Sequence, residues 1–274
     1  MAQEPMDKAV ILARGLGTRM RKSDATASLD PRQAAIAQTG VKALIPLDRP
    51  FLDYVLSVLA DAGYSWACLV VAPEHDAIRN YYREQSPPRR IHVDFAVQEE
   101  PRGTADAVAA AEGFAGGEPF LVINSDNYYP EEALRQLRRQ EGCAVALFED
   151  AAMLEGSNIA PERLQHFAIG KIDERGCLKR VLEKPDEATL ATMPRPRWVS
   201  MNCWRFGPSI FEACRKVRPS PRGELELPDA VQYAIDVLGE RFVVVKVRAP
   251  VLDLTSRSDV AAVAARLAGV EVDL

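Results

Sequence analysis

The sequence predicts an α/β protein built on a doubly wound, mixed sheet that is mostly parallel. Short apolar runs of strand length recur along the chain, and most are continuous rather than alternating, which is typical of strands covered on both faces. Helical patterns separate the early runs. Because 274 residues with 47% hydrophobic content can bury one sizeable core, we expect a single domain over residues 1–274.

The expected strands of the main sheet are the apolar runs at residues 9–12, 67–71, 93–97, 120–123, 145–148 and 242–247. Between the early runs, Phe51, Val55 and Val58 share one helical face, and residues 104–112 are rich in alanine. Pro130 opens a charged helix that extends to residue 140.

The second half of the chain predicts a small antiparallel subregion. Residues 198–206 are expected to form a strand, and a turn near residues 173–176 predicts a hairpin. Residues 23–40 contain no strand pattern, but an alanine-containing helical piece follows Pro31. We expect residues 23–40 to be a mobile insertion in the loop after the first strand.

Composition narrows the class of ligand. The formal charge of −5 gives no global attraction for nucleic acid or for an anionic membrane, so any positive field must be confined to a site, as a nucleotide or sugar phosphate requires.

Five scattered cysteines argue against both a disulfide framework and a zinc site. No apolar run approaches the ~20 residues that span a bilayer. We therefore expect a soluble cytoplasmic protein, and homo-oligomerisation is left open.

A glycine-containing loop, A-R-G-L-G-T-R, follows the first strand directly. Gly15 and Gly17 let backbone N–H groups approach an anion, and Arg19 adds a planar fork of donors that matches phosphate oxygens. The loop lacks the third glycine of the dinucleotide fingerprint, where Met20 stands, and the G-K-[ST] of the P-loop. An ordinary turn is the alternative interpretation.

Polar residues also follow other predicted strands, at the end of an open α/β sheet where ligands bind. Asp126 suits Mg²⁺, which takes one or two carboxylates plus phosphate oxygens, and the alternative is a helix N-cap or an Asx turn before Pro130. Asp253 is the best candidate for a second carboxylate, with helix capping again the alternative. Gln98 carries a donor and an acceptor that suit the imide edge of a pyrimidine, and its alternative role is that of a surface glutamine.

The order and spacing of seven fragments resemble the sugar-1-phosphate nucleotidylyltransferases, which have a GT-A-like, Rossmann-like nucleotide-binding fold. The fragments are A-R-G-L-G-T-R, V-K-A-L-I-P-L at 41–47, Q-E-E-P-R-G-T-A-D-A from Gln98, N-S-D-N around Asp126, E-K-P at 183–185, R-G-E-L-E-L from Arg222 and D-L-T-S-R-S-D from Asp253. They span nearly the whole chain.

The resemblance implies roles for individual residues. Ala13, Gly15, Gly17, Thr18 and Arg19 would hold the triphosphate, and Lys42 would neutralise charge near its α-phosphate. Gln98 and Gly103 would read the base, and Thr104 would also bind the nucleotide. Asp126 and Asp253 would hold Mg²⁺, and Glu183, Lys184, Asn202 and Arg222 would bind the sugar 1-phosphate. The implied reaction is in-line attack of the sugar-phosphate oxygen on the α-phosphorus, with pyrophosphate leaving, catalysed by Arg19, Lys42, Asp126 and Lys184 through charge neutralisation and alignment.

Some residues depart from the family pattern. Arg14 stands where a small residue is usual, and Thr255 replaces a glycine beside Asp253. Asn202 also lies where glycine is frequent, and asparagine tolerates the left-handed conformation better than most residues. Gln98 favours UTP or dTTP, although G-T-A-D-A also resembles enzymes that use ATP.

Two competing functions follow from the same residues. A non-catalytic sugar-nucleotide sensor of the same fold would be expected to lose metal or phosphate ligands first. A glycosyltransferase of similar fold would be expected to carry a D-x-D metal motif, and N-S-D-N lacks the first aspartate.

Overall fold

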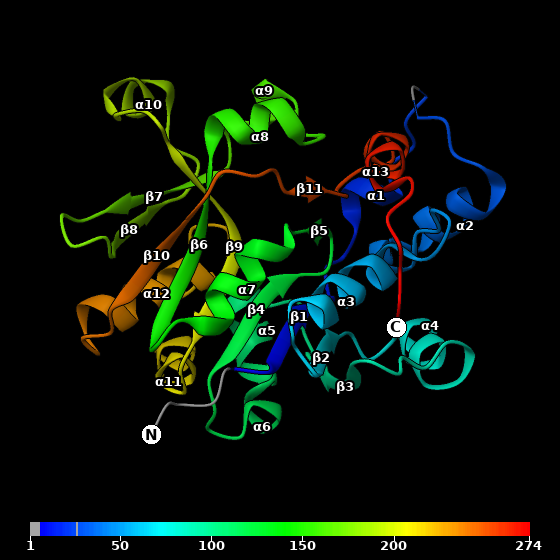
Figure 1. Cartoon of the computed structure of the whole chain (residues 1–274), viewed down its shortest axis with the longest axis horizontal. Helices are drawn as coiled ribbons and strands as arrows, with labels where there is room; N and C mark the ends of the chain where they lie inside the picture. Colours follow the sequence, from blue (N-terminus) through cyan, green and yellow to red (C-terminus); the bar gives the residue numbers. More distant parts are fainter. Residues whose placement is uncertain (1–5, 26) are drawn as a thin grey trace.

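The computed structural model describes residues 6–25 and 27–274 and confirms the mixed, doubly wound α/β fold (Figure 1). The main sheet has the strand order β10-β6-β9-β4-β1-β2-β3. Its strands are β1 (Lys8–Leu12), β2 (Trp66–Val71), β3 (His92–Val97), β4 (Phe120–Asn124), β6 (Cys143–Glu149), β9 (Trp198–Phe206) and β10 (Phe242–Val247). Each strand predicted from an apolar run is present, with ends that differ by two residues at most.

The strand β9 runs antiparallel between β4 and β6, whereas β4, β1, β2 and β3 pair in parallel with one another. The predicted hairpin is confirmed as β7 (Ala168–Ile172) and β8 (Leu178–Leu182), and its strand β7 pairs with β9. The antiparallel subregion thus shares the central strand β9 with the main sheet. A separate two-stranded sheet joins β5 (Asn127–Tyr128) to β11 (Leu252–Asp253).

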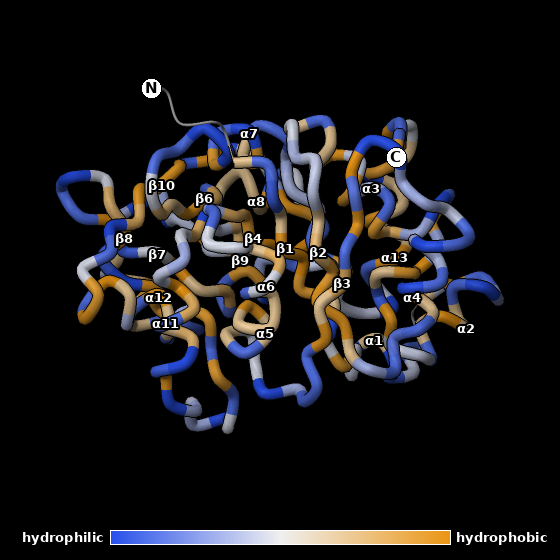
Figure 2. The backbone as a smooth tube through the Cα atoms, turned by 90° about the horizontal axis from the view of Figure 1, so that it is seen from below, coloured by the Kyte–Doolittle hydropathy of each residue, from blue (hydrophilic) through white to orange (hydrophobic). Residues whose placement is uncertain are grey.

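Helices cover both faces of the sheet because its parallel strands are apolar on both faces. In β1, Ala9 and Ile11 pack into one core while Val10 packs into the other, so successive side chains enter opposite layers. The first core includes α3 (Phe51–Asp61) and α7 (Glu131–Arg139), and the second includes α5 (Thr104–Ala110), α11 (Ser209–Lys216) and α12 (Leu227–Asp236). Figure 2 shows hydrophobic residues concentrated along the central strands and hydrophilic residues around them.

The remaining helices lie in the connections between these elements. They are α1 (Thr18–Arg21), α2 (Pro31–Thr39), α4 (Asp76–Asn80), α6 (Glu112–Ala115), α8 (Asp150–Gly156), α9 (Pro161–Leu164), α10 (Glu187–Thr192) and α13 (Asp259–Leu267), with the short turns η1 (Lys42–Leu44) and η2 (Tyr81–Gln85).

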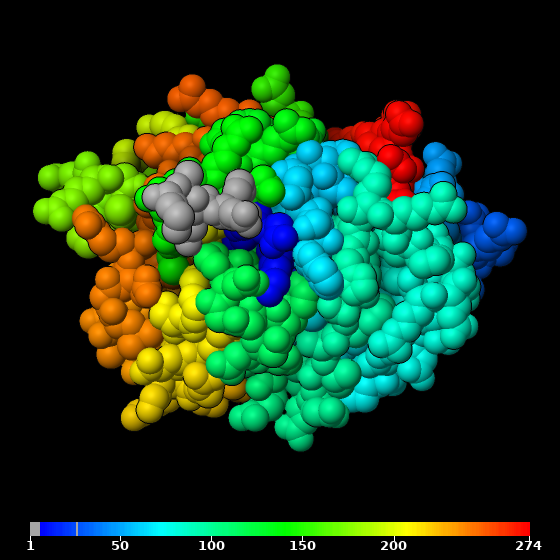
Figure 3. Space-filling view, turned by 60° about the horizontal axis from the view of Figure 1, so that its bottom comes forward, coloured from blue at the N-terminus to red at the C-terminus, as the bar shows by residue number. Residues whose placement is uncertain are grey.

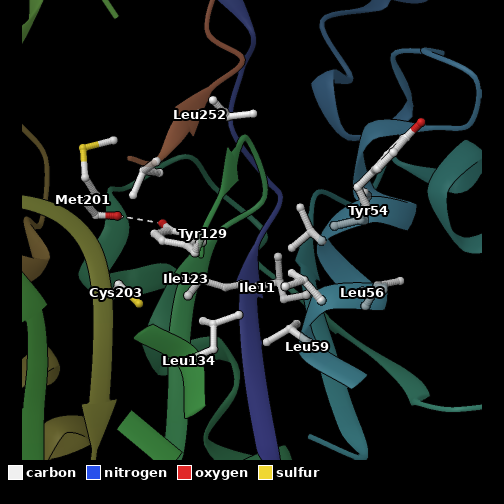
Figure 4. Close-up of a cluster of buried hydrophobic side chains, with 14 of the residues drawn as sticks. Ile11, Tyr54, Leu56, Leu59, Ile123, Tyr129, Leu134, Met201, Cys203 and Leu252 are labelled. Carbon is white, nitrogen blue, oxygen red and sulfur yellow. Dashed lines mark hydrogen bonds between the residues drawn. The ribbon is translucent and has the colours of Figure 1, made fainter. Parts of the chain in front are cut away.

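A buried polar contact joins Tyr129, the residue after β5, to β9 within the first core (Figure 4). The Tyr129 hydroxyl donates a hydrogen bond of 2.7 Å to the carbonyl oxygen of Met201 in β9. Around it, Ile11 and Ile123 of neighbouring strands face Leu59 of α3. Because a buried hydroxyl without a partner is costly, this bond also fixes the position of β9.

The segment 23–40 contains the helix α2, as predicted after Pro31. The Asp30 side chain caps it by accepting from the backbone N–H groups of Arg32 (2.7 Å) and Gln33 (2.8 Å). The Gln33 side-chain oxygen in turn accepts from the backbone N–H of Asp30 (3.1 Å). This reciprocal pair is a capping box. Residue 26 lies outside the described residues, and the mobility of the segment stays a prediction.

The two edge strands are less buried than their apolar sequences predict. β3 has intermediate or exposed residues along its whole length, and β10 alternates between buried and exposed positions. Each pairs with one neighbour in the main sheet, so one backbone edge of each lies at the margin.

At the amino ends of the strands, Lys8 ties β1 to the segment around α6. Its Nζ donates to the carbonyl oxygens of Phe114 and Ala115, at 3.2 Å each. Figure 3 shows this end, where the first described residues, in dark blue, lie between segments coloured green and cyan. Within residues 6–25 and 27–274, no helix has the length and apolar character needed to cross a membrane.

We expect Trp204→Ala to destabilise the fold by about 3–5 kcal/mol, since Trp204 is fully buried and packs against Phe206 and Phe242. The matched control is Trp66→Ala, which truncates a tryptophan that is 41% exposed and should cost no more than about 1 kcal/mol. Urea unfolding followed by circular dichroism measures both. Equal losses in the two variants would contradict the assignment of Trp204 to the core.

Candidate active site

The carboxyl ends of β1, β3 and β4 surround one pocket of about 400 Å³. The three strand-end features predicted to meet there, namely the glycine loop with Arg19, Gln98 and Asp126, all line it. The predicted site residues that line it are Ala13, Gly15, Gly17, Thr18, Arg19, Lys42, Gln98, Gly103, Thr104, Asp126 and Asn202. Asp253, Glu183, Lys184 and Arg222 lie outside its lining.

The glycine loop requires glycine at position 17. Gly17 has φ +61°, and a Cβ added there would overlap the carbonyl oxygen of Gly40, so the loop lies directly against the residue that ends α2. A Cβ added at Gly15 would have no other atom within 4 Å. The loop passes into α1, where Arg19 is exposed at the pocket. The loop is therefore bare on the side that an anion would approach.

Asp126 forms an ion pair with Lys42 at the pocket, where both side chains are mostly buried. Lys42 belongs to η1, 84 residues earlier in the chain. The capping interpretation of Asp126 is wrong, because α7 begins after Pro130 with no side-chain cap. The ion pair thus places the Lys42 ammonium group next to the Asp126 carboxylate, a group that can bind a metal ion, in the wall of the pocket.

Asp253 lies beside Asp126 through the small sheet. In that sheet Asp253 is paired with Asn127, and the N–H of Leu254 donates to the carbonyl oxygen of Asp126 at 2.8 Å. The Asp253 carboxylate accepts from Asn127 Nδ2 (3.1 Å) and Thr255 Oγ1 (3.0 Å) and forms an ion pair with Arg163. Burial, and next the charge of Asp126, raise its pKa to about 6.

The interpretation of Asp253 as a helix cap is also wrong. The N-cap of α13 is Ser258, and no side chain caps that helix. The Asp259 carboxylate accepts from the backbone N–H groups of Thr255 (3.1 Å) and Ser256 (2.7 Å) in the loop before α13. Thr255, whose hydroxyl bonds to Asp253, supports that carboxylate rather than displacing it. Arg163, which bridges Asp253 and Asp259, was not identified from the sequence because it lies 90 residues from Asp253 in a four-residue helix.

The two carboxylates fit a magnesium ion shared with a ligand. Within the described part of the chain, no group of three or more His, Cys, Asp or Glu residues is placed to hold a metal by itself. Mg²⁺ does not need one, since it takes one or two carboxylates and completes its shell with water and phosphate oxygens. The small sheet sets the backbone of Asp126 beside that of Asp253 and Leu254, so the two carboxylates belong to adjacent segments.

Gln98 is 4% exposed, so the surface interpretation of this residue is wrong. Its Nε2 donates to the Gly103 carbonyl (3.0 Å) and to Asp106 Oδ2 (2.8 Å). Gly103 has φ +117°, and a Cβ there would overlap the Leu225 carbonyl oxygen, which requires glycine. The structure thus adds Asp106, which no sequence signal singled out, to the predicted Gln98–Gly103 pair.

The residues predicted to bind sugar phosphate divide between two places. Asn202 lines the pocket with φ +53°, which confirms the left-handed conformation expected of it. Lys184, also at positive φ (+41°), lies exposed in the segment after β8, and Arg222 forms an ion pair with Glu226 at 2.8 Å just before α12. Lys184 follows β8 and Arg222 precedes α12, and these two elements are in contact.

Comparisons with known proteins agree with this geometry. The chain matches the family described as nucleotidyl transferase over residues 8–246. It is 29% identical over 241 residues to the low-salt glycan biosynthesis nucleotidyltransferase Agl11 of Haloferax volcanii, covering 84% of this chain but only 59% of that relative. It is 26% identical over 232 residues to the UTP–glucose-1-phosphate uridylyltransferase AglF of the same organism, covering 83% of each chain. It is 26% identical over 231 residues to a glucose-1-phosphate thymidylyltransferase of Xanthomonas campestris, covering 84% of this chain and 70% of the relative.

Solved structures share the fold at lower sequence identity. A UDP-glucose pyrophosphorylase complexed with UDP-glucose superposes with a TM-score of 0.71 at 20% identity, covering 95% of this chain and 97% of that one. A UDP-glucose pyrophosphorylase from Acinetobacter baumannii superposes with a TM-score of 0.74 at 16% identity, covering 97% and 95%.

We expect the stability of the metal-free protein to depend on pH through Asp253. Its pKa is about 6 in the fold against an ordinary 3.8, so the native state holds that proton more tightly than the unfolded chain does. The resulting stabilisation is present below about pH 4, is lost as the pH rises to about 6, and changes no further above that.

Asp253→Asn removes this titration, so the unfolding free energy of the variant minus that of wild type should rise between pH 4 and 6 and then level off. Urea unfolding with a chelator present, at half-unit pH steps, measures it. A difference that is flat over this range would show that Asp253 titrates normally.

Proposed function

The chain belongs to the nucleotidyl transferase family, and from this premise we propose that it transfers the nucleotidyl group of UTP or dTTP to a sugar 1-phosphate, releasing pyrophosphate. The observation that carries the proposal is the meeting of the glycine loop, Gln98 and the Lys42–Asp126 pair in one pocket at the carboxyl ends of the strands. The relatives named as uridylyl- and thymidylyltransferases support UTP and dTTP as the donors.

The triphosphate would lie on the glycine loop. Gly15 and Gly17 leave the backbone open to phosphate oxygens, and Arg19 supplies a charged fork at the pocket. Lys42, beside Asp126, would add a positive charge next to the α-phosphate. The base would lie at the other end of the pocket, against Gln98, Gly103 and Thr104.

The sugar 1-phosphate would approach from the side of β8 and β9. Asn202 lines the pocket there, and Glu224 extends the lining toward Arg222 in the same segment. Lys184 and Arg222 would bind its phosphate, with Glu183 contacting a sugar hydroxyl. Two polyanions must meet in such a reaction, so cations from separate elements are required.

In the proposed step an oxygen of the sugar phosphate attacks the α-phosphorus and forms a new P–O bond, while the bond from the α-phosphorus to the bridging oxygen breaks and pyrophosphate leaves with the electron pair. The attacking oxygen is already anionic, so no protein base is needed. Asp126 and Asp253 would hold a Mg²⁺ ion, which neutralises phosphate charge and helps to align the reacting groups. Arg19, Lys42 and Lys184 orient the two substrates.

A non-catalytic sensor of the same fold is less favoured by the site. Such a protein would be free to lose the charged residues at the reacting phosphate, yet Arg19, Lys42 and Asp126 all line the pocket.

The five cysteines are unpaired and four of them are buried, which supports a reducing cytoplasm as the place of action.

We expect Mg²⁺-dependent release of pyrophosphate when the protein is given UTP or dTTP together with a hexose 1-phosphate. A screen of nucleoside triphosphates against sugar 1-phosphates with a coupled pyrophosphate assay measures it. Asp126→Asn should lower turnover by at least ~100-fold at unchanged melting temperature, because it removes a charge that acts in phosphoryl transfer. Asp94→Asn, at a half-exposed site on the edge strand β3 away from the pocket lining, is the control.

Folded wild-type protein that releases no pyrophosphate with any pair of substrates would refute the enzymatic proposal. A normal rate in Asp126→Asn would place the metal elsewhere.

A further inference from the structure

The amide of Gln98 has a fixed orientation. Its nitrogen faces the Gly103 carbonyl and the Asp106 carboxylate, at 3.0 and 2.8 Å. Both partners only accept hydrogen bonds, so the atom that faces them must be Nε2 rather than Oε1. The two N–H groups of the amide are thereby used within the protein, and Oε1 is the group left for a ligand.

Arg14 fixes the backbone that carries this amide. It is 8% exposed, and it donates from Nε to the Gln98 carbonyl (3.2 Å) and from Nη2 to the Glu99 carbonyl (3.3 Å). Its Nη1 is buried without a hydrogen-bond partner among the described residues. Burial of an arginine with an unused donor costs stability, so stability alone gives no reason for an arginine at this position.

The position of Gln98 explains why such support is needed. It follows β3, which lies at the margin of the main sheet, and its N–H donates to the Val71 carbonyl at 2.9 Å. Beyond this point β3 has no further ladder pairs. Arg14 therefore connects the glycine loop directly to the segment that faces the base.

We propose that Asp106 and Arg14 are positioning residues for base recognition, which make Gln98 a hydrogen-bond acceptor toward the base. The inference rests on the proposed function and extends it to the choice of nucleotide. An acceptor pairs with the ring N3–H of uracil or thymine, whereas N3 of cytosine is itself an acceptor and is repelled. The site thus selects UTP and dTTP against CTP.

Calorimetric titration with UTP, CTP and inorganic tripolyphosphate tests this selection without turnover. The UTP-to-CTP affinity ratio should fall about tenfold or more in both Asp106→Ala and Arg14→Ala, because the Gln98 amide is then free to turn or shift. Affinity for tripolyphosphate, which has no base, should change less than about threefold. If Asp106 and Arg14 only stabilised the fold, their loss would weaken the binding of UTP, CTP and tripolyphosphate alike and would leave the UTP-to-CTP ratio unchanged.

Two matched controls carry the same chemistry away from the pocket. Asp236 accepts from the Gln232 side chain at 3.0 Å on the surface of α12, and Arg79 donates to the successive carbonyls of Ala72 and Pro73 at 2.7 and 3.0 Å. Asp236→Ala and Arg79→Ala should keep the wild-type ratio. Should an alanine variant fold poorly, Asp106→Asn and Arg14→Lys, which retain an acceptor and one donor, should give intermediate ratios.

A wild-type ratio in both Asp106→Ala and Arg14→Ala, or an equal loss of tripolyphosphate affinity, would overturn the positioning roles. A wild-type protein that prefers CTP would overturn the selection itself. A wild-type protein that binds neither UTP nor tripolyphosphate would instead refute the proposed function, and the positioning roles with it.

Discussion

Parallel alignment of β4, β1, β2 and β3 is the constraint on which the site depends. The register sets Leu12 of β1 opposite Asn124 of β4 and Val70 of β2, and Val70 in turn opposite Ala96 of β3. The segments that follow these strands therefore emerge at one edge of the sheet. This alignment is maintained by the two cores, because each strand buries alternate side chains in opposite layers.

At that edge, charge is arranged locally in a protein that is acidic overall. Arg19 and Lys42 line the pocket, although the formal net charge of the chain is −5. Asp126 is paired with Lys42 and lies next to the segment of Asp253, which is paired with Arg163. Such a site suits a polyanion bound together with a divalent cation, because the protein carboxylates can bind the divalent cation and the protein cations can bind the polyanion.

The sequence identified the elements and the pocket well, for a physical reason. Continuous apolar runs report strands that are buried on both faces, and polar residues directly after them report the ligand edge, as Gln98 and Asp126 show. It did not reveal the lower burial of the edge strands β3 and β10, because edge position depends on pairing across the whole sheet. Nor did it reveal partners that are distant in the chain, such as Arg163 of Asp253, or the contacts that Arg14 makes with the segment after β3.

The central claim is that the glycine loop binds the triphosphate while the cations near β8 bind the second substrate. Calorimetric titration of UTP alone, without sugar phosphate, tests it most directly in Arg19→Ala and Lys184→Ala. A charge-assisted phosphate contact is worth about 1.5–3 kcal/mol, so Arg19→Ala should weaken UTP binding about tenfold or more, and Lys184→Ala should leave it within about twofold. Equal losses in the two variants, or an unchanged affinity in Arg19→Ala, would contradict this division of the site.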